Sequence, residues 1–184
     1  MWTIANALSL VRILLIPVFL VLLIHQKGTA AFVVFLFAAS TDLLDGFAAR
    51  FWNQKSKLGA VLDPAADKLL MTASFIILTI PSLNAPNRIP IWLTSSVIGR
   101  DLLIVSAAFF LYKRYGQTEF PPTFTGKLST ALQMGVLLLV LLFNLIGTSP
   151  PSLKLFYILT LFLTVLSFIH YAIIGLRMTR LNDS

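Results

Sequence analysis

Four aspartates lie close together in a chain that has few acidic residues. Asp42, Asp45, Asp63 and Asp67 fall within residues 42–67, although the whole chain contains only seven acidic residues. Carboxylates packed together raise one another's pKa or need cations between them. The chain has no cysteine, and carboxylate ligands alone favour hard cations such as Mg²⁺, Mn²⁺ or Ca²⁺ over zinc. Two such ions bridged by shared aspartates would stabilise a phosphoryl displacement, which predicts a diphosphate substrate.

The spacing of the four aspartates predicts two helices that present them to one site. The first two are three residues apart and the last two are four residues apart, so each pair lies on one helical face. Residues 50–58 can form the turn between the helices. An alternative is that the acids only pair with basic residues nearby in the sequence. The small residues that would let the helices pack closely are Gly46, Ala49 and Gly59.

This window also fits the pattern D-x2-D-G-x2-A-R-x8-G-x3-D-x3-D at every fixed position. The pattern resembles the motif of the CDP-alcohol phosphatidyltransferase family. The resemblance implies that CDP-diacylglycerol, or a related CDP-alcohol, donates its phosphatidyl group to an acceptor hydroxyl and releases CMP. It implies two ions, Mg²⁺ or Mn²⁺, held by the four aspartates, with Asp67 also acting as the general base. The CDP-binding positions that it implies are Asp45, Gly46, Ala49, Arg50 and Gly59.

Composition places the predicted site in a membrane. The 184 residues are 58% hydrophobic and 11% charged, which is far more apolar than a soluble domain. This length allows about six spans of ~20 residues and no second folded domain. We therefore expect an all-α membrane protein with six transmembrane helices, a short interfacial segment over residues 1–6, and one domain over residues 1–184. The predicted spans are 7–25, 29–51, 58–80, 89–112, 126–146 and 153–178.

The basic residues predict the orientation of these spans. A net charge of +7 would suggest nucleic acid as the partner of a soluble protein, but these charges flank apolar segments, where they set topology and attract anionic lipids. We therefore expect membrane lipids and no nucleic acid as partners. One side of the six-span topology would carry eight basic residues and the other only Lys27, Arg88 and Lys154. The richer side, expected in the cytoplasm together with the aspartate site, carries Arg50, Lys55, Lys57, Lys113, Arg114, Lys127, Arg177 and Arg180.

Two further groups of polar residues lie within predicted spans. Asn6, Ser9 and Arg12 recur every three residues, which indicates either a stripe facing the site or a helix cap and an arginine that reaches the lipid headgroups. Arg100 and Asp101 lie midway along the fourth span, where ionisable residues are costly. They either neutralise each other or place Arg100 against a substrate.

The identity of the acceptor depends on a second resemblance. The segments GRDLLIVSAAF and PTFTGKLSTALQ resemble the cardiolipin synthase branch of the family, and Ser129 occupies the place where phosphatidylglycerophosphate synthases usually carry a second lysine. A doubly charged phosphomonoester should need that cation more than a singly charged phosphodiester does. Phosphatidylglycerol is therefore the expected acceptor, with glycerol 3-phosphate as the alternative. The expected acceptor-binding residues are Arg100, Lys127, Ser129 and Arg177.

Two other classes of protein share some of these features. Intramembrane carboxylates also mark the ion path of a divalent-metal transporter, although small residues at fixed motif positions argue against this class. A catalytically silent member of the family is disfavoured because no motif position is missing. The resemblance also implies a homodimer.

Overall fold

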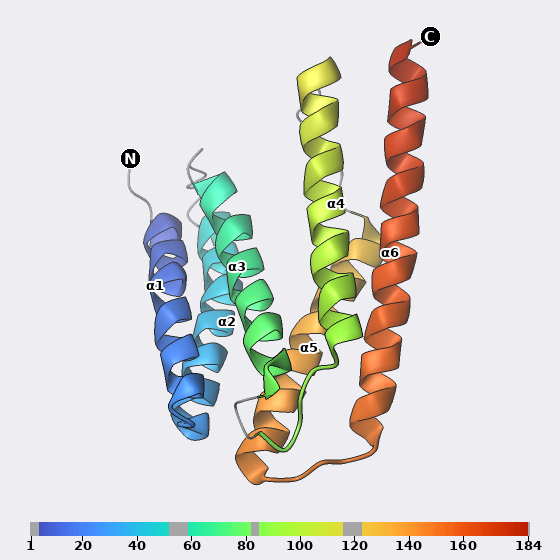
Figure 1. Ribbon diagram of the computed structural model, residues 1–184. Coiled ribbons are helices and arrows are strands. Elements are labelled where there is room, and N and C mark those ends of the chain that lie inside the picture. Colours follow the sequence, from blue (N-terminus) through green and yellow to red (C-terminus); the bar gives the residue numbers. More distant parts are fainter. Residues whose placement is uncertain (1–3, 52–58, 82–84, 116–122, 184) are drawn as a thin grey trace. The chain divides into compact units, whose positions relative to one another are not determined.

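The computed structural model describes the backbone of residues 4–51, 59–81, 85–115 and 123–183, and the side chains of 7–41, 63–81, 85–114, 123–176 and 178–179. Within these residues the regular structure is entirely α-helical (Figure 1). The helices are α1 (Ile4–Ile24), α2 (Gly28–Phe51), α3 (Gly59–Thr79), α4 (Ile91–Tyr115), α5 (Phe124–Ile146) and α6 (Ser152–Asp183).

The predicted helices are confirmed, whereas the number of membrane spans is confirmed only in part. Every predicted segment coincides with a helix whose ends lie within a few residues of the expected ones. Four helices in the described part are long and apolar enough to cross a membrane, namely α1, α4, α5 and α6. Within the residues of α2 whose side chains are described, the apolar stretch Gly28–Thr41 is shorter than these four.

The chain divides into two compact units, which are described separately. The first comprises Met1–Arg88 and Leu137–Ser149. In this unit α1 packs against both α2 and α3. The rings of Phe19 and Phe35 lie 5.5 Å apart between α1 and α2, and Leu70 and Phe75 of α3 are also buried. Aromatic and aliphatic packing of this kind holds α1 against the two helices that carry the aspartate window.

Polar contacts join α5 to the chain after α3 within the same unit. The Asn144 side-chain oxygen accepts from the backbone nitrogen of Asn87 at 2.7 Å and from its side-chain amide at 3.0 Å. In return the Asn144 amide donates to the Asn87 carbonyl at 3.0 Å. These bonds satisfy backbone groups of an irregular segment, which would otherwise be costly in a membrane.

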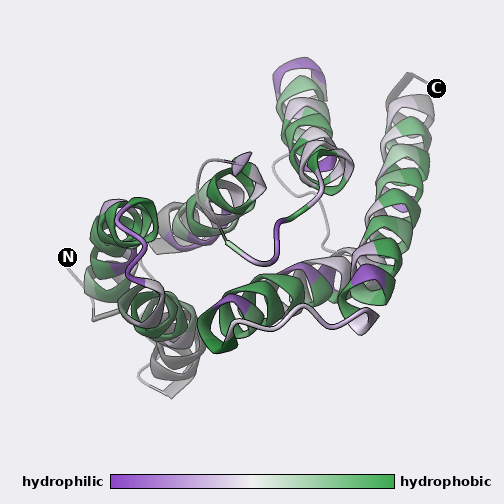
Figure 2. Cartoon of the chain, turned by 60° about the horizontal axis from the view of Figure 1, so that its bottom comes forward, coloured by the Kyte–Doolittle hydropathy of each residue, from purple (hydrophilic) through white to green (hydrophobic). Residues whose placement is uncertain are grey.

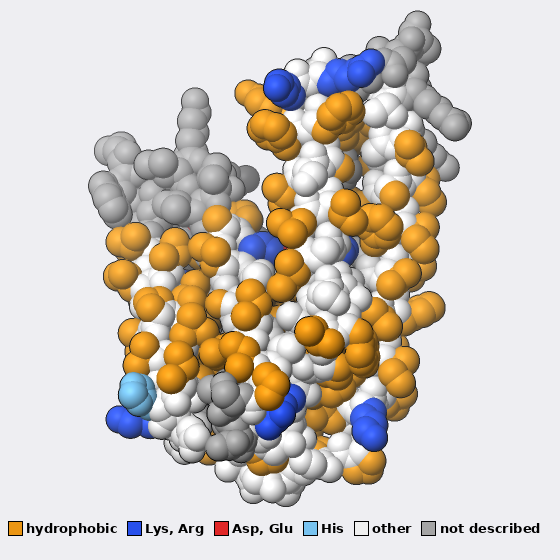
Figure 3. Space-filling view, in the orientation of Figure 1, with side chains coloured by type: hydrophobic (Ala, Val, Ile, Leu, Met, Phe, Trp, Pro, Cys, Tyr) orange, Lys and Arg blue, Asp and Glu red, His pale blue; other side chains and the backbone are white. Residues whose placement is uncertain are grey.

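The second unit comprises Ile89–Val136 and Pro150–Ser184, and in it α4 packs against α6. Hydrophobic residues predominate along the helices in Figure 2, and hydrophobic side chains cover much of the face shown in Figure 3. Val105 and Phe162, for example, are exposed by 67% and 61%. Such exposure is expected of side chains that face lipid.

Candidate active site

Helix α1 supplies partners for two of the four aspartates. The hydroxyl of Ser9 donates to Oδ1 of Asp63, and Nη1 of Arg12 forms an ion pair with Oδ1 of Asp67. Ser9 and Arg12 are three residues apart in α1, and the two aspartates are four apart in α3, so two facing helical stripes meet. Ser9 and Arg12 of the polar stripe predicted in the first span therefore face the acids and not the lipid headgroups, whereas the side chain of Asn6 lies outside the described residues.

Arg12 is held from a third helix as well. Its Nε donates to the carbonyl of Ala38 at 3.2 Å and to Oγ1 of Thr41 at 3.3 Å, both in α2. The Arg12 side chain is completely buried, whereas 32% of the Asp67 side chain is exposed. A buried guanidinium needs such partners because an unpaired buried charge is strongly disfavoured. Arg12 thus connects α2 and α3 through α1.

The first half of the aspartate window follows directly after Thr41. The backbone of residues 42–51 continues α2, and Gly59 begins α3. The side chains of six predicted site residues lie outside the described ones, so their predicted roles stay predictions. These residues are Asp42, Asp45, Gly46, Ala49, Arg50 and Gly59.

The described half of the window fits a hard cation in its chemistry. Asp63 and Asp67 offer carboxylate oxygens one helical turn apart, and carboxylates suit Mg²⁺ or Mn²⁺. Among the residues with described side chains, no group of three or more potential metal ligands occurs. The side chains of Asp42 and Asp45 lie outside the described residues, so the predicted metal site of four aspartates stays a prediction.

In the second unit, Arg100 of α4 faces α6. Its Nη1 contacts Oδ1 of Asp101 at 2.6 Å, and its Nη2 donates to Oγ of Ser167 at 2.7 Å. The guanidinium carbon lies 5.5 Å from the centre of the Tyr171 ring, a cation–π distance. Arg100 is only 6% exposed, and its buried Nε has no hydrogen-bond partner. The predicted neutralisation by Asp101 is therefore present, and one donor of Arg100 is left over.

Ser129 of α5 also contacts α6. Its partner there, Thr164, lies about one helical turn before Ser167, the partner of Arg100. Its hydroxyl is 3.3 Å from Oγ1 of Thr164, and the Gln133 amide nitrogen lies 3.2 Å from both hydroxyls. The side-chain oxygen of Gln133 is buried without a partner. We call Ser129, Gln133 and Thr164 the neutral cluster, because its members carry no charge.

Of the other two predicted acceptor residues, only Lys127 has a described side chain. Lys127 is exposed, and the side chain of Arg177 lies outside the described residues. Arg100 and Ser129 thus contact α6 at residues one turn apart, Ser167 and Thr164. Lys127 remains at the surface.

Several residues of this region were missed by the sequence prediction. Tyr171 accepts a hydrogen bond from the Thr123 backbone nitrogen at 3.2 Å. A Cβ atom on Gly126 would come within 2.9 Å of the Tyr171 hydroxyl, so this close approach requires glycine. A usable signal was present in four polar side chains that recur at helical spacing along the largely apolar middle of α6. They are Thr160, Thr164, Ser167 and Tyr171.

Each unit also contains a cavity. One of about 260 Å³ lies between α4 and α6, and its lining includes Arg100, Thr164, Leu103 and Phe168. Its lining is mostly apolar with a few polar groups, as in many ligand pockets.

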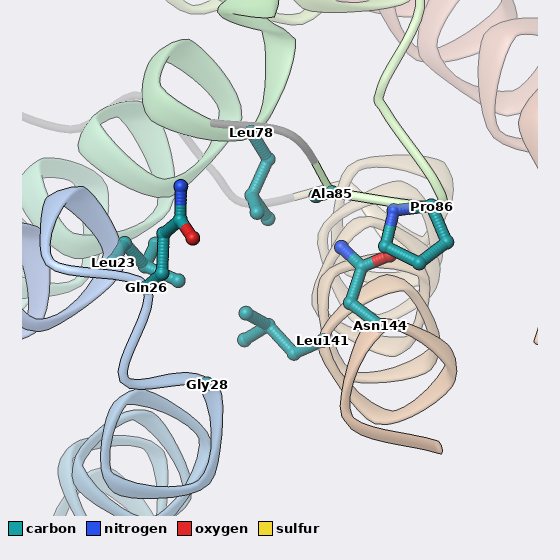
Figure 4. A pocket seen from close by; sticks show the side chains of 8 residues that line it. All are labelled: Leu23, Gln26, Gly28, Leu78, Ala85, Pro86, Leu141 and Asn144. Carbon is teal, nitrogen blue, oxygen red and sulfur yellow. The ribbon is translucent and has the colours of Figure 1, made fainter. Parts of the chain in front are cut away.

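The cavity in the first unit, of about 220 Å³, is far along the helices from the aspartates. It is lined by residues that include Gln26, after the end of α1, and Leu78, near the end of α3 (Figure 4). Ser9 and Asp63 lie near the beginnings of the same two helices. Gln26 adopts a left-handed backbone with φ of 57°, which belongs to the tight turn into α2. We assign this cavity no part in the aspartate site.

These features define an all-helical membrane protein with an acidic site on one helix group and a buried arginine on another. The family model described as CDP-alcohol phosphatidyltransferase matches residues 2–173. The chain belongs to this family. Members of the family generally depend on divalent metal ions.

Individual relatives carry two different names. Proteins named cardiolipin synthase (CMP-forming) from Rattus norvegicus and Homo sapiens are 41% and 40% identical over 149 residues, which is 72% of this chain and 48% of each relative. The chain therefore spans about half the length of these relatives. A protein from Aquifex aeolicus named CDP-diacylglycerol--glycerol-3-phosphate 3-phosphatidyltransferase is 32% identical over 175 residues, which is 94% of this chain and 96% of that protein.

Proposed function

We propose that the protein transfers the phosphatidyl group of CDP-diacylglycerol to phosphatidylglycerol, forming cardiolipin and CMP. Family membership and the names of the rat and human relatives support the reaction class. Transfer to glycerol 3-phosphate is the second candidate, and it is favoured by the name and full-length match of the Aquifex relative.

The observation that carries the choice of acceptor is the neutral cluster. Ser129 is fully buried, and the partners described for its hydroxyl, Thr164 and Gln133, are uncharged. The nearby Arg100 already contacts a carboxylate, that of Asp101. A dianionic phosphomonoester would find less positive charge here than it requires, whereas a phosphodiester brings one negative charge. We propose Arg100, Lys127, Ser129 and Arg177 as acceptor-binding residues.

We propose that Asp67 acts as the general base. The acceptor hydroxyl oxygen forms a bond to the phosphorus of the phosphatidyl group, and the bond between that phosphorus and the oxygen of the departing CMP breaks. Asp67 receives the hydroxyl proton. The proposed CDP-binding positions are Asp45, Gly46, Ala49, Arg50 and Gly59. Two divalent ions, Mg²⁺ or Mn²⁺, would be held by Asp42, Asp45, Asp63 and Asp67. When bound, they would supply neutralisation of the diphosphate and of the departing CMP.

An ion path is a weaker explanation of the aspartates. Arg12 is buried and paired with Asp67, and a fixed positive charge beside a carboxylate opposes the passage of cations. In a reaction centre, by contrast, the same charge adds to the neutralisation of a diphosphate. This contact favours the enzyme over the divalent-metal transporter.

We further propose one domain over residues 1–184 with six membrane spans, the aspartate site facing the cytoplasm, and a homodimer. The excess of basic residues on one side supports this orientation. A reporter fused after Ser184 should then be cytoplasmic, and one inserted at residues 82–87 should be on the opposite side. A C-terminus on the opposite side from the cytoplasm would contradict the six-span topology.

The acceptor is tested by a direct competition. Purified protein given CDP-diacylglycerol should make cardiolipin from phosphatidylglycerol faster than it makes phosphatidylglycerophosphate from glycerol 3-phosphate. An unmatched phosphate charge in a partly desolvated site costs roughly 1–3 kcal/mol, so the expected selectivity is about 10- to 100-fold. Faster use of glycerol 3-phosphate would establish the second candidate instead.

A further inference from the structure

We propose that Arg12 is a positioning residue for Asp67 and the resident cation of the aspartate site. It would hold the carboxylate in place and supply one positive charge before any metal or substrate binds. This inference rests on the proposed function for the role of Asp67 in the reaction, but its physical basis is the contact network of α1.

The donors of Arg12 reach two helices at once. The Arg12 guanidinium uses Nη1 for Asp67 in α3 and Nε for Ala38 and Thr41 in α2. A planar guanidinium fixes the directions of its donors relative to one another. Because Nε is anchored on α2, the carboxylate of Asp67 is held in a defined place relative to the helix that carries Asp42 and Asp45.

Arg12 also contributes a positive charge beside the aspartates. Four ionised aspartates would carry four negative charges, and repulsion among them opposes folding in the absence of metal. Arg12 reduces that total by one charge from a position that is completely buried, where screening by salt is weak. The protein therefore holds part of the compensation itself, and the divalent ions supply the remainder.

A merely structural arginine would behave differently from a resident cation. If Arg12 only packs and bonds three helices together, its loss should destabilise the metal-free and metal-loaded protein equally. If it compensates the aspartates, its loss should matter most when no other cation is present. The dependence of stability on Mg²⁺ distinguishes the two roles, because an ion bound by the folded protein stabilises it and would replace the charge that is lost with Arg12.

The test compares Arg12→Gln, Arg12→Lys and the wild type by thermal unfolding in detergent, with chelator or with saturating MgCl₂. We expect Arg12→Gln to lower Tm about twice as much in chelator as in MgCl₂, because the added ions replace the lost charge. Arg12→Lys keeps the charge and should restore the wild-type response to Mg²⁺. Equal loss of Tm under both conditions would overturn the proposal.

Turnover gives a second readout. Arg12→Gln should lower kcat about 10- to 100-fold with little change in KM for CDP-diacylglycerol, since misplacing a reacting group by about 1 Å costs roughly 100-fold. A loss confined to KM would contradict a positioning role. If wild-type protein forms no CMP, the proposed function fails, but the Mg²⁺-dependent difference in Tm still tests the resident cation.

Two milder variants keep the test decisive if Arg12→Gln does not fold. Thr41→Val removes one acceptor of Nε and keeps the charge, so it should lower kcat without changing the Mg²⁺ response. Ser74→Ala is the matched control, because Ser74 is a fully buried α3 residue whose hydroxyl bonds the Leu70 carbonyl of its own helix. Thr41→Val should lower kcat more than Ser74→Ala does. Equal kcat values for these two variants would overturn the positioning role.

Discussion

Each unit of the chain contains a buried arginine that pairs with an aspartate, but the two aspartates differ in their position along the chain. In the first unit, Arg12 pairs with Asp67, 55 positions away, and so joins separate helices. In the second unit, Arg100 pairs with the adjacent Asp101 and keeps a buried Nε without a partner. The first arrangement holds the carboxylate that we propose as the base, whereas the second pairs the arginine with its neighbour and leaves Nε without a partner. In our proposal the first unit supplies the base and the second unit binds the acceptor.

The largest effect is expected from Asp67→Asn. The amide cannot take the acceptor's proton, so turnover should fall by roughly 10²- to 10⁴-fold with either acceptor, while CDP binding stays measurable. The assay is CMP formation alongside equilibrium binding of CDP. Turnover near the wild-type rate would show that Asp67 is not the base, and the proposed difference in role between the two units would then fail.

Ser129→Lys tests the proposed role of the second unit in selecting the acceptor. A cation placed in the neutral cluster should favour glycerol 3-phosphate and reduce the preference for phosphatidylglycerol by about 10- to 100-fold. The measurement is the ratio of kcat/KM values for the two acceptors. Thr130→Lys, one position further along α5, is the control and should leave the ratio near that of the wild type. If both lysines act alike, Ser129 does not select the acceptor.

Asp101→Asn should have a smaller effect in the same direction. Without the carboxylate, the charge of Arg100 is available to an anionic acceptor, which is worth roughly 1 kcal/mol or about fivefold in the preference for glycerol 3-phosphate. Comparing KM for each acceptor separates this from a loss of chemistry. An equal loss of kcat with both acceptors would indicate that Asp101 contributes to the reaction itself and not to the choice of acceptor.

Gly126→Ala should change stability more than selectivity. The added Cβ would lie 2.9 Å from both the Tyr171 hydroxyl and Oγ1 of Thr123, and such overpacking costs about 1–3 kcal/mol. Gly135 in the same helix is the matched control, since nothing lies within 4 Å of its added Cβ. Gly135→Ala should be neutral or stabilising. Equal unfolding temperatures for the two variants would refute the close approach of α5 and α6.

The sequence predicted the helices well because four of them are long apolar runs and the other two place polar residues at helical spacing. It also located the aspartate window, since acids at helical spacing are conspicuous in an apolar chain. The contacts of that window were harder, because Ser9 lies 54 positions before Asp63 and only packing makes them neighbours. Likewise, the need for glycine at position 126 depends on Tyr171, which belongs to another helix. Pairwise contacts between distant helices cannot be derived from the spacing within each one.

We propose that the four aspartates hold the divalent ions needed to release CMP from CDP-diacylglycerol. The most direct measurement is CMP formation by purified protein after exhaustive chelation, followed by titration with MgCl₂ or MnCl₂. We predict no activity without added ions and full recovery as they are restored, because the one resident cation that we propose cannot balance four carboxylates and a diphosphate. Full activity in the chelated protein would contradict the account.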